Sequence, residues 1–96
     1  MQLHFEWDSV KAARNLLKHE VSFVDATDVF RDPLALTLYD VDHSNGEDRW
    51  VTLGKVKTLR LVVVIHTWQE QDDEVIHVRI ISAREATVQE MKQYEG

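Results

Sequence analysis

The hydrophobic pattern of the first twenty residues changes from a two-residue period to a helical one. Residues 3–7 alternate between apolar and polar side chains, which predicts a short strand. Residues 9–20 then carry apolar side chains at a helical spacing, and Asp8 precedes them as an N-cap. The apolar stripe that we expect this helix to bury consists of Val10, Ala13, Leu16 and Leu17. The opposite face, expected in solvent, carries Lys11, Asn15 and Lys18.

The rest of the chain predicts one more helix, four strands and a C-terminal helix. The second helix begins at Ser22, which can form a capping box with Asp25, and it ends before Pro33. An acidic loop is expected at 69–74, and Ser82-Ala83-Arg84-Glu85 matches a capping box that would open the last helix. The predicted strands are 34–39, 48–53, 60–68 and 75–81, the first two joined through the hairpin signal Asn45-Gly46.

These elements define an α+β fold with the order β-α-α-β-β-β-β-α. Such an order predicts a twisted, mainly antiparallel sheet with the helical hairpin packed on one face. A chain of 96 residues has room for one core, so residues 1–96 are expected to form a single domain.

The composition fits a protein of a reducing compartment. The chain has no cysteine, its first residues lack the basic and apolar regions of a signal peptide, and its longest apolar run, residues 61–65, is too short to cross a membrane. We therefore expect a cytoplasmic protein with no membrane contact.

The charge distribution argues against a protein that coats nucleic acid without specificity. The net charge is −6, whereas such proteins usually present a basic surface. The acidic side chains gather in two segments, residues 40–48 and 70–74. Lys11, Arg14 and Lys18 form a separate basic group, so one local basic site is compatible with the sequence.

Three residues are candidates for chemistry. Arg79 lies in an apolar strand on the same side as His77, which indicates either a working surface or a solvated face. Arg84 is expected in the first turn of the last helix, against the helix dipole, where it could bind a phosphate or cover the core with its stem. His19 follows Lys18 at a helix end, as a dipole partner or as a general acid–base.

The common nucleotide-binding, serine-hydrolase and zinc-protease motifs are absent from the sequence. The five histidines, at positions 4, 19, 43, 66 and 77, do not have the spacing of a metal site, and His43 reads as a turn residue. No metal and no cofactor are therefore expected. A cationic surface with histidines suits RNA cleavage by the ribose 2′-hydroxyl, which needs cations on the phosphate and proton carriers nearby.

The chain resembles the BrnT toxins along nearly its whole length. Glu20 departs from the pattern, because such toxins often have a glycine after the Lys-His pair. The matching residues are Phe5-Glu6-Trp7-Asp8, Lys11, Asn15, Lys18-His19, Val21-Ser22-Phe23, Val29-Phe30, Asp32-Pro33, Asp42-His43, Gly46-Glu47, Arg49, Leu61-Val62-Val63-Val64, Arg79-Ile80-Ile81-Ser82-Ala83-Arg84, Glu90 and Tyr94.

The resemblance implies a RelE-like fold and a metal-independent endoribonuclease that stops growth when it is free. It also implies a BrnA-like antitoxin that neutralises the toxin and through which the complex binds operator DNA. The alternative is a non-catalytic module that keeps the fold and acts only in a regulatory complex with its partner.

The resemblance also assigns roles to particular residues. Arg79 and Arg84 would hold the scissile phosphate, and His19 or Glu47 would carry the proton. The residues expected to bind RNA are Lys18, Arg49 and Tyr94.

Overall fold

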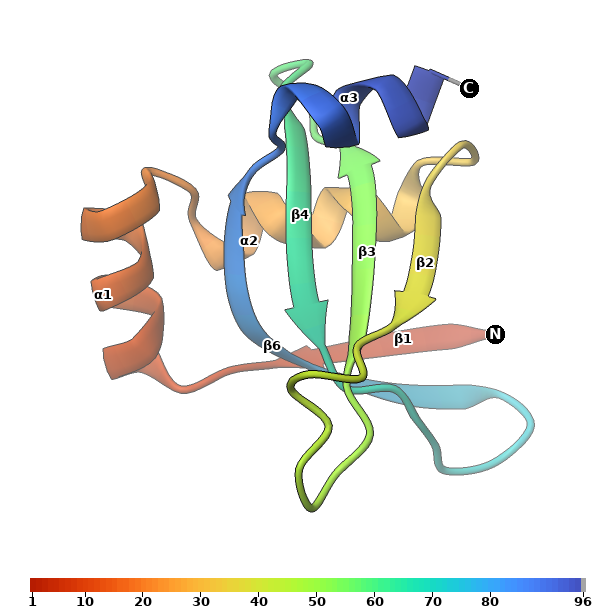
Figure 1. Cartoon of the computed structure of the whole chain (residues 1–96). Helices are drawn as coiled ribbons and strands as arrows, with labels where there is room; N and C mark the ends of the chain where they lie inside the picture. The colour runs from red at the N-terminus through yellow and green to blue at the C-terminus, as the bar shows by residue number, and fades with distance from the viewer. Residues whose placement is uncertain (96) are drawn as a thin grey trace.

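The structure is a computed structural model that describes residues 1–95, and it is a mixed α+β protein, as expected (Figure 1). Among these residues, no helix is long and apolar enough to span a membrane. The elements in chain order are β1 (Gln2–Glu6), α1 (Ser9–His19), α2 (Phe23–Ala26), the 3₁₀ helix η1 (Thr27–Arg31), β2 (Leu36–Tyr39), β3 (Trp50–Lys55), β4 (Leu61–His66), β5 (Gln69–Glu70), β6 (Val75–Glu85) and α3 (Val88–Glu95).

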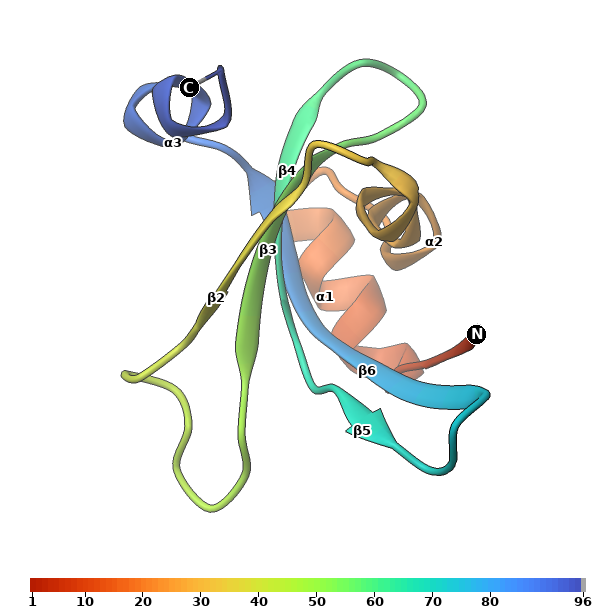
Figure 2. The same cartoon turned by 90° about the vertical axis from the view of Figure 1, so that its right-hand side faces the viewer.

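The strands form one sheet in the order β1-β6-β4-β3-β2, with β5 paired to β6. Every pair is antiparallel except β1 with β6, so the expectation of a mainly antiparallel sheet is confirmed. The helices α1 and α2 lie against one face, and α3 crosses the opposite face at one end of the sheet (Figure 2). The predicted hairpin of helices on one face is also present.

Each face of the sheet carries its own apolar cluster. The larger one joins the α2–η1 segment to β4 and β6, with Phe23, Val29 and Val64 fully or almost fully buried. Gly54 of β3 allows this close packing, because a Cβ at that position would lie 2.9 Å from the Cβ of Val29. The smaller cluster lies beneath α3 and includes Leu53.

The last strand is longer than predicted, and this changes the setting of Arg84. Residues 82–85 continue β6 and do not cap a helix; the capping box is the next one, in which Thr87 Oγ1 accepts from the backbone N–H of Glu90 and the Glu90 carboxylate accepts from Thr87 N–H. Between Ile65 and His66 the register shifts by one residue, which leaves Ile81 as a bulge in β6. The bulge puts Arg79 and Arg84 on the same face of the sheet although they are five residues apart.

The helix α1 packs differently from the prediction. Asn15, expected in solvent, is buried, whereas the apolar Val10 and Leu17 are exposed. The Asn15 amide donates to Val21 O and Ala83 O and accepts from Ala83 N–H. Because β1 ends opposite Arg79, the outer edge of β6 has no strand beside Ala83, and the Asn15 side chain supplies the hydrogen bonds that a strand would make.

Two other segments also depart from the prediction. The second helix continues from α2 into the 3₁₀ turn η1. The acidic segment 69–74, expected as a loop, contains β5. The strands β2 and β3 form the predicted hairpin, but their connection runs from residue 40 to 49, and Gly46 has a φ of +83° within it.

Candidate active site

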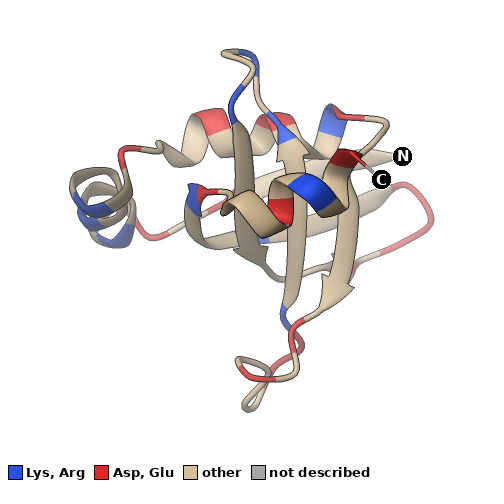
Figure 3. Ribbon diagram, turned by 45° about the horizontal axis from the view of Figure 1, so that its top comes forward, with Lys and Arg blue, Asp and Glu red and all other residues tan. Residues whose placement is uncertain are grey.

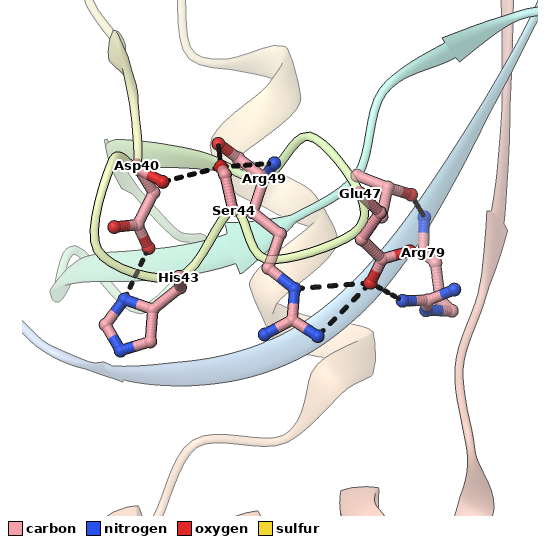
Figure 4. Close-up of polar contacts among 7 residues, drawn as sticks. Asp40, His43, Ser44, Glu47, Arg49 and Arg79 are labelled. Atoms are coloured by element: carbon pink, nitrogen blue, oxygen red, sulfur yellow. Dashed lines mark hydrogen bonds and ion pairs between the residues drawn. The ribbon is translucent and has the colours of Figure 1, made fainter.

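The connection between β2 and β3 is a closed loop held by Ser44. The Ser44 hydroxyl donates to Asp40 O at 2.6 Å and accepts from Arg49 N–H at 3.0 Å, and Asp40 N–H donates to Arg49 O at 2.9 Å (Figure 4). These bonds tie the two ends of the loop together. The loop backbone is therefore fixed at both ends, and this fixes the positions from which the side chains between them project.

At this loop, one carboxylate holds two arginines. Glu47 Oε1 accepts from Arg49 Nε at 3.2 Å and from Arg49 Nη2 at 3.1 Å, and it also accepts from Arg79 Nη2 of β6 (Figure 4). The hydrogen bond from Arg79, followed by that from Arg49, lowers the pKa of Glu47 despite the opposing effect of burial. The cluster carries two positive charges and one negative charge, so it has a surplus of one positive charge at neutral pH.

The strand β6 and Thr67, the residue directly after β4, hold Arg79 in place. Its backbone N–H donates to Thr67 Oγ1, and its carbonyl accepts from Thr67 N–H, both at 3.0 Å. The guanidinium is partly exposed. Of the predicted site residues, Glu47, Arg49 and Arg79 are therefore brought together, although Arg79 is 32 positions from Glu47 in the sequence.

The same loop carries His43, which the sequence predicts to be a turn residue. His43 Nδ1 lies 2.8 Å from Oδ2 of the nearly buried Asp40. Because an ionised carboxylate only accepts hydrogen bonds, Nδ1 carries the proton and Nε2 of a neutral ring is left as a base. In Figure 4 the His43 imidazole and the Arg49 guanidinium project from the same side of the loop. The signal in the sequence was Asp40-x-x-His43 next to Glu47-x-Arg49.

Arg84 lies near the C-terminal end of β6, five residues after Arg79, and has a different partner. Its Nη1 and Nη2 atoms bond the two oxygens of Glu90 in α3, at 2.8 and 3.0 Å. The hydrogen bond from Arg84 lowers the pKa of Glu90 to about 2. This pair is bidentate and electrically neutral, and it attaches the start of α3 to the sheet. The structure thus separates Arg84 from Arg79, with which it was predicted to share a phosphate.

Lys18 and His19 lie away from the cluster. Arg79 is paired with Glu6, two residues before the N-cap of α1, whereas Lys18 and His19 are the last two residues of that helix. A helix of 11 residues is roughly 15 Å long, and α1 covers the face of the sheet opposite to α3. In the ribbon of Figure 3, the basic positions of α1, coloured blue, form a group of their own. The structure does not bring these two residues to Glu47.

Tyr94, predicted to bind RNA, makes a structural contact. Its hydroxyl donates to Asp32 Oδ2 at 2.6 Å, which raises the pKa of the tyrosine, and the same oxygen accepts from Lys55 N–H at 2.8 Å. The Lys55 ammonium lies 5.9 Å from the centre of the Tyr94 ring. These contacts fasten the end of α3 to η1 and β3.

The fold and this cluster define a small α+β protein with a guanidinium–carboxylate site on a loop at one end of its sheet. Among residues 1–95, no group of three or more His, Asp or Glu side chains could hold a metal ion. The family described as "Ribonuclease toxin, BrnT, of type II toxin-antitoxin system" matches residues 7–90. The chain belongs to this family, as the resemblance had indicated.

A solved structure supports the fold. The crystal structure of the ribonuclease toxin BrnT from Brucella abortus superposes with a TM-score of 0.63 at 22% sequence identity, covering 90% of this chain and 99% of that chain. A search of curated proteins finds no match. The fold class is therefore confirmed, whereas the roles predicted for individual residues stay predictions.

Proposed function

We propose that this chain is itself an endoribonuclease, and that it cleaves RNA without a metal at the loop that carries Glu47, Arg49 and Arg79. The observation that carries the proposal is the surplus positive charge of two guanidiniums on one carboxylate. Arginine forks match the geometry of phosphate oxygens, and cations aimed at the phosphate stabilise the charge that develops in the transition state.

In the proposed reaction, the ribose 2′-oxygen attacks the adjacent phosphorus and the bond from phosphorus to the 5′-oxygen breaks. Nε2 of His43 takes the proton of the 2′-hydroxyl, and Asp40 keeps the imidazole in the required tautomer. The 5′-oxygen leaves with a proton from solvent or from a protonated side chain. The products are a 2′,3′-cyclic phosphate and a 5′-hydroxyl.

Glu47 is better suited to positioning than to proton transfer. Its pKa is lowered by Arg79 and Arg49, which makes its carboxylate a weaker base than a free glutamate. Its oxygen holds both arginines within reach of one phosphate. His19, the other proton carrier that the resemblance suggested, lies at the far end of α1.

The type II system to which the family belongs supports a further part of the proposal, a protein antitoxin. We propose a BrnA-like antitoxin that neutralises the chain and carries the binding of operator DNA. The chain's own net charge of −6 suits a basic antitoxin better than it suits DNA, because opposite charges speed association.

Two experiments test this function. Expression in bacteria should arrest growth, and a neighbouring antitoxin gene should rescue it. The purified protein should cleave RNA in the presence of a chelator and leave 2′,3′-cyclic phosphate ends. Continued growth together with intact RNA would indicate the non-catalytic binding module instead.

A further inference from the structure

A pocket lies on the face of the sheet opposite to Arg79. It has a volume of about 390 Å³ and is lined by Thr37, Trp50, His66 and Trp68. His66 pairs with Ile80 in the sheet, and Ile80 belongs to the core on the α2 side, whereas Arg79 points to the other face. The candidate active site therefore makes no use of this pocket.

Aromatic rings surround the pocket. The ring of Phe30 meets His66 edge to face at 4.7 Å between centroids, and Tyr39 meets Trp50 in the same way at 5.1 Å. Trp68, about one third exposed, lies 6.4 Å from Phe30 and from His66. Rings of tryptophan and tyrosine present negative faces that attract cations.

A chain of hydrogen bonds determines which polar group the pocket offers. His66 is fully buried, and burial lowers its pKa, so the ring is neutral at pH 7. Its Nδ1 lies 2.9 Å from the carbonyl of Thr67, which can only accept, so Nδ1 carries the proton and Nε2 accepts. Thr52 Oγ1, at 2.7 Å from Nε2, must therefore donate to it.

The same reasoning determines which hydroxyl donates in the hydrogen bond between Thr37 and Thr52. Because the proton of Thr52 is used on His66, the hydrogen bond of 2.9 Å between Thr37 and Thr52 has Thr37 as its donor. The Thr37 hydroxyl, which is at the pocket wall, then has only lone pairs left. The threonine chain therefore presents an acceptor to the pocket, which suits a ligand that brings its own N–H groups.

The charges near the pocket favour a cation as well. Trp50 directly follows the acidic loop 40–49, and Trp68 directly precedes the acidic segment 69–74. Both segments project from the same end of the sheet (Figure 1), and the ribbon of Figure 3 is coloured red at their acidic positions. Asp48 accepts a hydrogen bond from the Tyr39 hydroxyl at 2.9 Å. A basic side chain that enters the pocket would be attracted by these carboxylates.

We propose that this aromatic pocket is a docking site for a basic segment of a protein partner, and that an arginine or lysine side chain of that segment enters between Trp50 and Trp68. The cation would contact the ring faces and donate to Thr37 Oγ1. The inference goes beyond the proposed ribonuclease activity and does not depend on it.

The test uses protein labelled with ¹⁵N and follows the indole N–H signals of its three tryptophans during titration. The probes are a short peptide of alternating glycine and arginine, a matched peptide of glycine and glutamate, and an oligomer of uridine. Trp7 packs against Phe23 on the α1 side and serves as an internal control. We expect the arginine peptide to shift Trp50 and Trp68 and to leave Trp7 unchanged, with weaker binding as salt is raised.

Two variants complete the test. Trp68→Leu should weaken binding of the arginine peptide by roughly 5- to 30-fold, which corresponds to the loss of one cation–π contact. Thr37→Val, at an exposed position that tolerates the change, should weaken it as well, whereas Thr58→Val in the exposed β3–β4 turn should not.

Three results would overturn the inference. The first is that the uridine oligomer, and not the arginine peptide, shifts Trp50 and Trp68, which would make the pocket a nucleobase site. The second is that Trp7 shifts as much as the other two, and the third is that Trp68→Leu and Thr37→Val both bind like the parent. Since no RNA cleavage is measured, the outcome is separate from that of the proposed function.

Discussion

The middle and the C-terminal end of β6 each carry an arginine on the same face of the sheet, and the two arginines have different roles. In the middle of the strand, Arg79 shares the carboxylate of Glu47 with Arg49, and a positive charge is left over. Near the end of the strand, Arg84 has a carboxylate of its own, Glu90, in a bidentate pair. The comparison teaches that the ratio of arginines to carboxylates, and not the presence of an arginine, separates a site that can take a phosphate from a site that holds a helix.

Removing Arg79 should have the largest effect on activity. We expect Arg79→Ala to slow RNA cleavage by about 100- to 1000-fold, because one fixed donor to the developing charge is lost. The midpoint of thermal unfolding should change little, since the guanidinium is partly exposed. Cleavage of a labelled RNA by purified protein measures the effect, with Lys57→Ala, a cation outside the cluster, as the control. A variant that cleaves like the parent would remove Arg79 from the site.

The rate of RNA cleavage should also depend on His43 of the same loop. We expect His43→Gln to lower cleavage on the order of 100-fold through the loss of a general base. The matched control is His77→Gln, which changes a histidine on β6 that bonds Gln71 and should keep the parent rate. An unchanged rate in His43→Gln would show that another group takes the proton.

At the pair of Arg84 with Glu90, the effect should be on stability. The pKa of Glu90 falls from 4.5 to about 2 on folding, so the ionised pair stabilises the protein above pH 4.5 and its contribution is lost as the pH falls toward 2. Because Arg84 is partly exposed, we expect Glu90→Gln to cost about 1–2 kcal/mol at pH 7 and almost nothing near pH 2. Urea unfolding at the two pH values measures this; an equal cost at both would contradict the ion pair.

The smallest effect concerns the end of α1. Glu20 caps this helix with a φ of 59°, in the left-handed region that glycine adopts without strain. Glu20→Gly should raise the free energy of unfolding by about 0.5–1 kcal/mol, whereas Lys18→Gly within the helix should lower it by about 1 kcal/mol. Loss of stability in Glu20→Gly would mean that its side chain makes a contact more valuable than the relief of strain.

The sequence was informative where one local rule determined the structure. The alternation in residues 75–80 and the β-branched run in 61–65 predicted β6 and β4, and Asp8 predicted the start of α1. The C-terminal helix was placed too early because two Ser/Thr-x-x-Glu patterns follow each other, and only strand pairing with β4 decides that the second one is used.

Local sequence rules could not predict which face of α1 is buried, for a different reason. A polar residue at position 15 normally indicates solvent, but an unpaired edge of β6 needs hydrogen bonds, and the Asn15 amide satisfies them. The candidate active site was predictable only in part, because it too depends on contacts between distant parts of the chain. Glu47 and Arg49 are neighbours in one loop, whereas Arg79 reaches them through a sheet register that the sequence does not specify.

The most direct test of the account compares Arg79→Ala with Arg84→Ala in one assay. Both proteins are given the same RNA with a chelator present, and cleavage rates are corrected for the fraction of folded protein. The account predicts that Arg84→Ala cleaves within a few-fold of the parent and that Arg79→Ala is at least about 100-fold slower. Equal rates for the two variants, or a larger loss in Arg84→Ala, would contradict it.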